Sequence, residues 1–394
     1  MNFPSHFERL SRITSSCRRK IQMKEKLQLV LVIATCLLFS SQLTSCSFFV
    51  TKPETVSSGI IDANNPDIQY IGRFDFSNQK RVVFDWAGVY ICAKFTGTSC
   101  AVRLKDSTDE YAVIIDDHAP RLFVPDSSGI TTVAAGLSDS VPHTIMIQKR
   151  TEPLVGKGVF MGFVLDKGAV LLPPAPRPNR RIEFIGNSIT SGFGVLGDSA
   201  NCNFSPQTED AGMSYASQVA RDLHADYHLI SYSGRGVVRN YGDSSRTSVD
   251  PMPALYDRTC CFDSTLKWNF SSWVPQVVVI NLGTNDYSTH PYPDSSVFKE
   301  GYERLIDSVR SYYPGVTIFC VSGPMIGEPC TGYVRDVVEH ERKLEGRDKD
   351  VFFIDIPRSI MNDHDWGCDM HPNVYGSMKM ADVVVPIVRL WMNW

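Results

Sequence analysis

The sequence predicts two domains, an all-β sandwich or jelly roll followed by a three-layer α/β domain with a parallel sheet. Three observations lead to this prediction: short alternating runs of apolar and polar residues over 67–172, a proline-rich connection over 173–180, and compact apolar runs separated by helical stretches over 181–394. A chain of 394 residues, of which 43% are hydrophobic, is long enough to bury two cores of moderate size.

The first predicted domain consists of short strands. Apolar and polar residues alternate along 81–86, 101–104, 111–115 and 143–148, and Gly, Asp, Ser and Pro residues separate these runs. Alternation with a period of two turns one face of each strand toward a core, and regularly spaced turns are typical of a sandwich or jelly roll. The prolines of 173–180 favour an extended, stiff connection, so we expect the domain boundary there.

The second predicted domain alternates strands with helices. Its compact apolar runs, typical of buried parallel strands, are residues 181–185, 228–232, 276–281, 316–321 and 351–354. The helical stretches between them include 214–223, 297–312 and 333–344. This alternation predicts a parallel sheet with helices on both faces, and in such sheets the loops after the carboxyl ends of the strands carry the chemistry.

Residues 1–46 have the features of an export signal. A basic stretch precedes the apolar run 27–39, and the signal ends at Leu43-Thr44-Ser45-Cys46. A cysteine directly after Leu-Thr-Ser resembles the bacterial lipobox, which implies that Cys46 is lipidated and anchors an exported lipoprotein to a membrane, at the cell surface or in the periplasm, through the linker 47–66. The alternatives are an ordinary signal peptide and a single spanning helix, although the run is shorter than the roughly 20 residues that a span needs.

Composition limits the partners and the metal sites. The formal net charge of −4 is spread without long runs of one sign, which argues against nucleic acid as a partner. Export places the cysteines in an oxidising compartment, where a local bridge between Cys92 and Cys100, in neighbouring predicted strands, is one expected pairing. No histidine lies at a metal-finger spacing from the cysteines, so we expect no structural zinc.

Loops of the second domain hold residues suited to acyl transfer. Ser188 follows the first predicted strand, where it can present its hydroxyl at the start of a helix or simply cap that helix. Gly234 and Asn285 follow the next two strands, and a glycine N–H and an asparagine amide can donate hydrogen bonds to an oxyanion. His371 precedes the predicted last helix and supplies a general base.

The order and spacing of these residues resemble a known superfamily. Gly186-Asn187-Ser188, Gly234, Gly283-x-Asn285-Asp286 and His371-Pro372 resemble the conserved blocks of the SGNH or GDSL-like hydrolases. The resemblance implies Ser188 as nucleophile, His371 as base, the Ser188 N–H, Gly234 N–H and Asn285 side chain as oxyanion hole, and no cofactor. A β-sandwich before the hydrolase domain, together with Ser-Tyr-Ser-Gly-Arg-Gly and Gly-Cys-Asp-x-His-Pro, is similar to the acetyl-xylan esterases of carbohydrate esterase family two.

The narrower resemblance implies a substrate class. It predicts a serine esterase that removes O-acetyl groups from plant cell-wall polysaccharides, such as acetylated xylan or glucomannan. One alternative is a lipase- or lysophospholipase-type esterase, whose activity changes with the length of the acyl chain. The other is a surface lipoprotein that binds glycans without hydrolysing them.

The sequence departs from the superfamily at the acid of the catalytic triad. The usual acid lies three residues before the histidine, but that position is Cys368, and Asp369 is displaced by one residue. Either Asp369 still reaches the imidazole as a third member, or Asp365 or another acid replaces it, or a backbone carbonyl orients the ring. Carbohydrate esterase family two includes dyads of the last kind, and we expect a dyad here.

Trp366, Asp286 and Tyr287 are the candidates for substrate contact. Trp366, five residues before the histidine, can wall the acyl pocket, stack on a sugar or pack in the core. Asp286 and Tyr287 lie beside Asn285, and Asp286 can instead brace its loop by hydrogen bonds.

Overall fold

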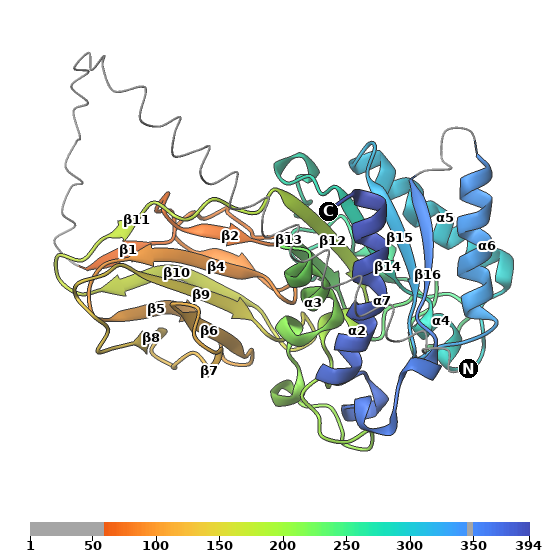
Figure 1. Ribbon diagram of the computed structural model, residues 1–394, viewed down its shortest axis with the longest axis horizontal. Coiled ribbons are helices and arrows are strands. Elements are labelled where there is room, and N and C mark those ends of the chain that lie inside the picture. Colours follow the sequence, from red (N-terminus) through yellow and green to blue (C-terminus); the bar gives the residue numbers. More distant parts are fainter. Residues whose placement is uncertain (1–58, 345–349) are drawn as a thin grey trace, which may run out of the picture. The chain divides into compact units, whose positions relative to one another are not determined.

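The computed structural model describes residues 59–344 and 350–394 (Figure 1). The predicted signal segment 1–46, with Cys46, and residues 47–58 of the predicted linker lie outside the described residues. Within the described part of the chain, no helix combines the length and the apolar character that a membrane span requires. All described residues belong to one compact unit.

The N-terminal domain is a sandwich of two antiparallel sheets. One sheet has the order β1-β10-β5-β8, with β3 also paired to β10, and the other has the order β11-β4-β9-β6-β7, with β2 also paired to β4. The strands are β1 Ile60–Asp62, β2 Gln69–Ile71, β3 Val82–Phe84, β4 Tyr90–Phe95, β5 Cys100–Lys105, β6 Tyr111–Ile115, β7 Arg121–Phe123, β8 Ile130–Ala134, β9 His143–Lys149, β10 Gly158–Leu165 and β11 Leu171–Leu172. The predicted all-β first domain is confirmed.

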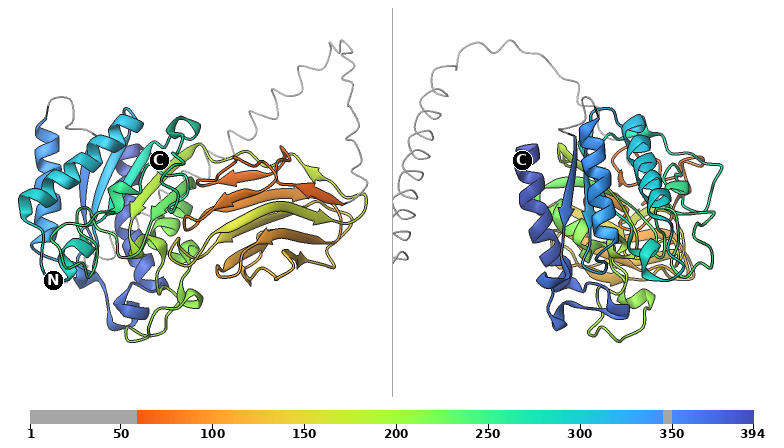
Figure 2. Two further views of the ribbon diagram at one scale, coloured as in Figure 1. Left: turned by 180° about the vertical axis from the view of Figure 1, so that it is seen from behind. Right: turned by 90° about the vertical axis from the view of Figure 1, so that its right-hand side faces the viewer.

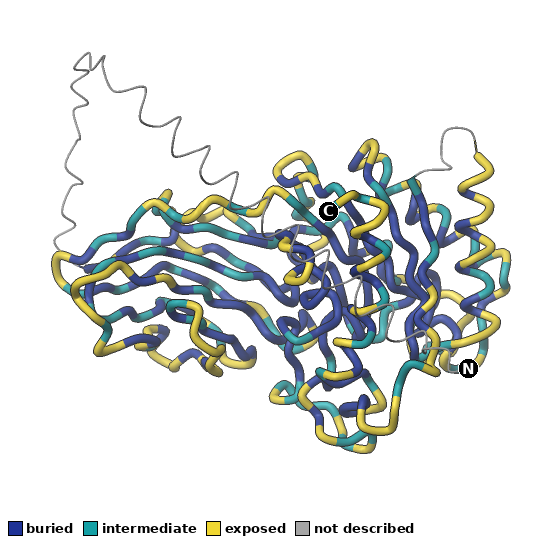
Figure 3. Tube along the Cα trace, viewed as in Figure 1, coloured by how far each residue is buried: buried dark blue, intermediate teal, exposed yellow. Residues whose placement is uncertain are grey.

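Alternating burial explains why these strands form. Along β4 and β5, buried residues alternate with partly exposed ones, because successive side chains of a strand point to opposite faces (Figure 3). Large buried side chains fill the core of the sandwich, among them Phe84, Phe95, Phe160 and Phe163.

The sandwich differs from the prediction at its start and in its cysteines. Ile61 of β1 lies opposite Phe163 of β10, so the sandwich begins before the predicted residue 67. Cys92 and Cys100 lie in β4 and β5, which belong to different sheets, and both are free. The predicted Cys92–Cys100 bridge is therefore wrong, because β4 and β5, although neighbours along the chain, do not pair with each other.

The C-terminal domain is built on a five-stranded parallel sheet in the order β13-β12-β14-β15-β16. Its elements are β12 Arg180–Gly186, α2 Ser188–Ser191, α3 Tyr215–Asp222, β13 Ala225–Ser231, β14 Val277–Asn281, α4 Thr284–Ser288, α5 Ser295–Tyr312, β15 Thr317–Ser322, α6 Cys330–Lys343, β16 Val351–Asp355 and α7 Val374–Met392. Every residue of β13 and β14 is buried, as expected for parallel strands that are covered on both faces.

Helices cover both faces of this sheet, which confirms the predicted three layers (Figures 1 and 2). Val277 and Val279 of β14 belong to the core that α3 and α7 cover, and that core includes Val384 of α7. Val278 and Ile280 point to the opposite face, where the core includes side chains of α5 and α6.

The register of the central strands aligns the loops that follow them. Gly186, the last residue of β12, lies opposite Ser231 of β13 on one side and Asn281 of β14 on the other. β12 lies between the next two strands of the chain: β13 pairs with it on one side, and β14 pairs with it on the other. The loops after these three strands therefore begin at one level of the carboxyl edge, the usual place for a site in such sheets.

Buried polar contacts join the sandwich to the α/β domain. A guanidinium nitrogen of Arg73 lies 3.3 Å from a carboxylate oxygen of Glu183 on β12, and both side chains are fully buried. The side-chain amide of Gln148 donates to the Tyr227 hydroxyl at 2.7 Å.

Candidate active site

A tight turn places Ser188 at the carboxyl edge of the sheet. β12 ends at Gly186 and α2 begins at Ser188, while the side chain of Asn187 accepts a hydrogen bond from the Ile189 N–H at 3.1 Å. A Cβ atom on Gly186 would lie 2.0 Å from the Thr190 hydroxyl oxygen, so only glycine fits there. Ser188 keeps 8% of its surface exposed at this turn.

His371 lies beside the Ser188 hydroxyl. The Nε2 atom of His371 is 2.8 Å from the Ser188 Oγ atom, and its Nδ1 atom is 3.0 Å from the backbone oxygen of Asp369. A carbonyl oxygen can only accept, so it holds the proton on Nδ1 and leaves Nε2 free to accept the proton of the serine. This geometry suits a nucleophile and its base.

The carboxylates of Asp369 and Asp365 contact partners other than the His371 imidazole. The Asp369 carboxylate accepts a hydrogen bond from the Phe204 N–H at 2.9 Å. The Asp365 carboxylate accepts from the Asn362 N–H at 2.6 Å and lies 2.5 Å from the Lys379 ammonium. The backbone carbonyl is therefore the group that orients the imidazole, and the geometry favours a dyad over a triad.

A disulfide fixes the loop that carries His371. Cys202 and Cys368 are bonded across 166 residues of sequence. Two backbone hydrogen bonds join the same loops, from the Asp369 N–H to Cys202 and from the Met370 N–H to Ala200, at 2.8 and 3.1 Å. The sequence leaves this pairing open, because the spacing of cysteines does not reveal which of them form a bond.

We expect loss of the Cys202–Cys368 bond to reduce both stability and activity. The Cys202→Ser variant should unfold with about 2–4 kcal/mol less stability, since the bond closes a long loop. Misplacement of the base by about 1 Å costs up to about 100-fold in rate, so kcat should fall at least several-fold. Thermal unfolding and initial rates measure both effects. The Cys92→Ser variant, which removes a free thiol, is the control, and equal behaviour of the two variants would contradict the prediction.

The aromatic ring of Phe193 packs against the imidazole of His371. The Phe193 ring centroid lies 4.5 Å from that of His371, and Phe193 stacks on Phe204 at 4.0 Å. Burial lowers the pKa of His371 to about 4, and the hydrogen bond to the Asp369 carbonyl opposes this shift. The imidazole is therefore neutral at pH 7, as a general base must be.

This low pKa predicts an unusual pH profile. An imidazolium cannot accept the serine proton, so kcat/KM should rise as pH increases through about 4 and stay level above it. A histidine with an ordinary pKa would give this rise near about 6.5. Hydrolysis of a soluble acetyl ester from pH 3.5 to 8, with unfolding followed at each pH, tests the difference. A midpoint above pH 6 in folded protein would contradict it.

The loops after β13 and β14 supply hydrogen-bond donors. Gly234 has a φ of 76°, and its N–H has no hydrogen-bond partner within residues 59–344 and 350–394. The Asn285 amide nitrogen donates one hydrogen bond to the backbone oxygen of Arg235 at 2.8 Å and has a second hydrogen to offer. Gly234 follows β13 and Asn285 follows β14, the two strands that pair with β12. The sequence predicted that each follows one of the next two strands.

The residues beside Asn285 have structural roles. The Asp286 carboxylate is fully buried and accepts the N–H groups of Val237, Val238 and Arg239 at 2.8 to 2.9 Å. Burial raises the pKa of Asp286 to about 6, against the effect of these donors. Asp286 therefore braces the loop after β13 by hydrogen bonds, the second of the two predicted roles, and its side chain is too buried for substrate contact.

Tyr287 and Trp366 are also largely buried. Tyr287 is 5% exposed and packs edge-on against Phe298, with a ring separation of 5.0 Å. Trp366 is 6% exposed, with the Arg358 guanidinium 4.5 Å from its ring centroid. Tyr287 belongs to the hydrophobic core, and Trp366 fits the core-packing alternative; contact of either residue with substrate stays a prediction.

No metal site accompanies these residues. Among the described residues, no group of three or more His, Cys, Asp or Glu side chains is placed to hold a metal ion.

A parallel α/β sheet that brings a serine and a histidine together at its carboxyl edge is typical of serine hydrolases. Residues 184–378 match the GDSL-like lipase/acylhydrolase family, and residues 70–176 match the N-terminal domain of carbohydrate esterase 2. The chain belongs to carbohydrate esterase family two.

Individual relatives agree with this assignment. The chain is 35% identical over 342 residues to the cellulase/esterase CelE of Acetivibrio thermocellus, across 84% of this chain and 40% of that protein. It is 34% identical over 311 residues to an acetylxylan esterase/glucomannan deacetylase of Cellvibrio japonicus, across 77% of this chain and 84% of that protein. A solved family two carbohydrate esterase from Clostridium thermocellum, in complex with cellohexaose, has a TM-score of 0.75 and 35% identity, covering 83% of this chain and 99% of that one.

Proposed function

We propose that this protein is a serine esterase that removes O-acetyl groups from plant cell-wall polysaccharides, with acetylated xylan and glucomannan as substrates. The separation of 2.8 Å between His371 Nε2 and Ser188 Oγ carries the proposal, because it gives the serine a base that can accept its proton. The name of the Cellvibrio japonicus relative supports the substrate class. Because the chain spans only 40% of CelE, activities of that longer protein are not transferred to it.

The proposed mechanism is acyl transfer in two steps. His371 accepts the proton of Ser188 while the serine oxygen attacks the acetyl carbonyl. The Ser188 N–H, the Gly234 N–H and the Asn285 amide donate hydrogen bonds to the resulting oxyanion. The sugar hydroxyl leaves with the proton from His371, and water, activated by the same histidine, then releases acetate and restores Ser188.

Acetate release tests this function. A chain that begins after Cys46 and its Ser188→Ala variant are incubated with acetylated xylan and acetylated glucomannan, and free acetate is measured. We expect release by the unchanged chain and none above background by the variant. Binding of the polysaccharide without release would favour the non-catalytic alternative, and activity that increases with acyl chain length would favour a lipase.

We also propose that the protein is exported and held at a membrane by lipid on Cys46. The support is the sequence Leu43-Thr44-Ser45-Cys46 after a basic and apolar segment. We expect the full chain to sediment with membranes and the Cys46→Ala variant to lose covalent lipid. Equal lipid labelling of both proteins would refute the anchor.

A further inference from the structure

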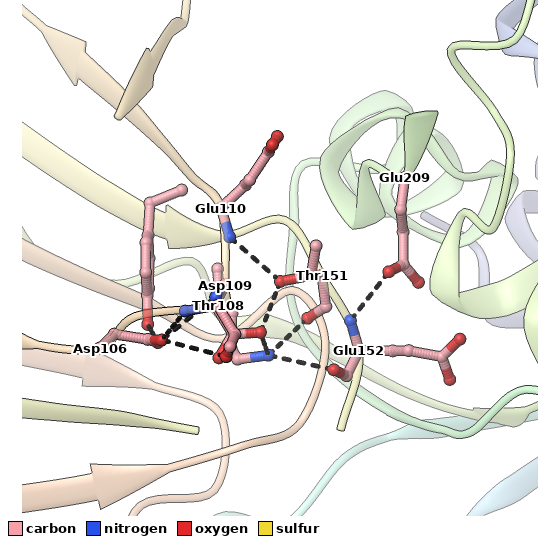
Figure 4. A network of polar contacts seen from close by, with 9 residues as sticks. Asp106, Thr108, Asp109, Glu110, Thr151, Glu152 and Glu209 are labelled. Carbon is pink, nitrogen blue, oxygen red and sulfur yellow. Dashed lines mark hydrogen bonds and ion pairs between the residues drawn. The ribbon is translucent and has the colours of Figure 1, made fainter. Parts of the chain in front are cut away.

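A buried segment of the sandwich reaches the loop that carries Gly234. Residues 149–152 consist of the last residue of β9 and the three residues that follow it. All four are buried, and Glu152 is fully buried. The Lys149 ammonium donates to the Asp109 carboxylate at 2.7 Å and to the backbone oxygens of Thr151 and Glu152 at 2.8 and 3.3 Å. This network, part of which Figure 4 shows, fixes the backbone from which the Glu152 side chain extends.

The Glu152 carboxylate accepts a hydrogen bond from the α/β domain. The donor is the backbone N–H of Ser233, 2.5 Å from the Glu152 Oε2 atom. Ser233 directly precedes Gly234, whose N–H is a proposed oxyanion donor. The backbone N–H of Glu152 in turn donates to the Glu209 carboxylate at 3.2 Å, so the segment is held on both sides (Figure 4).

Hydrogen bonds hold the backbone on both sides of the peptide group that contains the Gly234 N–H, and Glu152 accepts one of them. On the far side of that peptide, the Gly234 oxygen accepts from the Tyr241 N–H at 2.8 Å, and the Arg235 oxygen accepts from Asn285 at 2.8 Å. On the near side, the Ser233 N–H donates to the Glu152 carboxylate, and the Tyr232 oxygen of the same peptide group accepts from the Arg235 N–H at 3.3 Å. The Gly234 N–H lies between these fixed points and is left unpaired within the described residues.

We propose that Glu152, a residue of the β-sandwich, is a positioning residue for the esterase site: its carboxylate holds the Ser233 N–H and thereby aims the Gly234 N–H at the oxyanion. The inference rests on the proposed serine esterase function. It makes the sandwich part of the catalytic apparatus and not only a neighbour of it.

The burial of this carboxyl supports a role beyond domain docking. Burial raises the pKa of Glu152, which means that the folded state disfavours its charged form. Burying a carboxyl costs free energy that its hydrogen bonds offset only in part, so Glu152 contributes little to the docking of the two domains. Gln148 shows that a neutral amide can join the same two domains, through its hydrogen bond to Tyr227.

Three substitutions in the full-length chain separate positioning from docking. Glu152→Ala removes the acceptor, so kcat for a soluble acetyl ester should fall about 10- to 100-fold while KM changes less than about threefold. This loss is smaller than the roughly 100- to 1,000-fold loss for a removed oxyanion donor, because the Gly234 N–H is displaced and not removed. Glu152→Gln retains an oxygen that accepts from Ser233 and should keep kcat within about threefold. Gln148→Ala weakens the same interface away from the loop and should lower the unfolding temperature but not kcat.

The kcat values of these variants distinguish positioning of the Gly234 N–H from docking of the two domains. A kcat loss in Glu152→Ala that Glu152→Gln restores, with no such loss in Gln148→Ala, supports the proposal. Equal kcat losses in Glu152→Ala and Gln148→Ala, or full activity of folded Glu152→Ala, overturn it. If Glu152→Ala does not fold, Glu152→Met fills the space without accepting a hydrogen bond and takes its place. Absence of Ser188-dependent hydrolysis in the unchanged chain overturns the proposed function, and this inference with it.

Discussion

Replacing His371 by alanine is expected to lower kcat by about 10,000-fold or more, whereas Asp369→Asn should leave it within about fivefold of the unchanged chain. The first change removes the imidazole whose Nε2 atom lies 2.8 Å from the Ser188 hydroxyl oxygen. The second keeps the Asp369 backbone carbonyl, which accepts from the imidazole, and gives the side chain an amide oxygen that still accepts from Phe204.

Asparagine is the decisive substitution at position 369 because it preserves the backbone. Asp369 has a φ of 51°, in the left-handed region that asparagine tolerates better than alanine does. In a protease triad, the corresponding change to asparagine costs about 10,000-fold. Rates of acetyl-ester hydrolysis, with thermal unfolding as a check on folding, measure the difference. A loss in Asp369→Asn as deep as that in His371→Ala would establish a triad and refute the dyad.

Asn285→Ala is expected to lower kcat by about 100- to 1,000-fold, the typical effect of removing one oxyanion donor. KM should change little, because the hydrogen bond to the oxyanion forms fully only in the transition state. The Asn285 side chain also holds the Arg235 oxygen, so part of the loss comes from the loop after β13.

Thr284→Ala is a matched control for Asn285→Ala. Thr284 is the neighbouring residue in α4, it is 7% exposed, and its hydroxyl has no hydrogen-bond partner among the described residues. We expect kcat within about threefold and an unfolding temperature close to that of the unchanged chain, as for most substitutions without a polar partner. A kcat for Asn285→Ala that matches this control would exclude Asn285 as an oxyanion donor.

The periodicity of the sequence was sufficient to predict the architecture. Fully buried apolar runs such as the one in β14 occur in parallel strands covered on both faces, and alternating runs such as β4 occur in sandwiches, so the two domains differ in pattern. The start of the sandwich was missed because β1 has only three residues, Ile60–Asp62, too few to show a period. Its partner, β10, lies about a hundred residues later in the chain, beyond the reach of local patterns.

The site was predictable where the type of a residue alone determines its chemistry. Ser188 and His371 are brought together as expected, since each follows a strand end or precedes a helix at one edge of the sheet. The direction of the Asp369 carboxylate could not be predicted from the sequence. It accepts from Phe204, and the backbone at 369 and 370 is left-handed, which no local pattern indicates. The partners of Glu152 and of Cys202 also come from distant loops, and no local signal marks them.

The buried pair of Arg73 and Glu183 has a consequence for attempts to treat the two domains as interchangeable modules. A hydrolase domain cut out at the proline-rich connection would keep Glu183 in the middle of its sheet without the guanidinium that compensates its charge, an arrangement that costs about 3–5 kcal/mol. Grafting a foreign sandwich onto residues 181–394 would fail for the same reason unless the graft brought an arginine to this position.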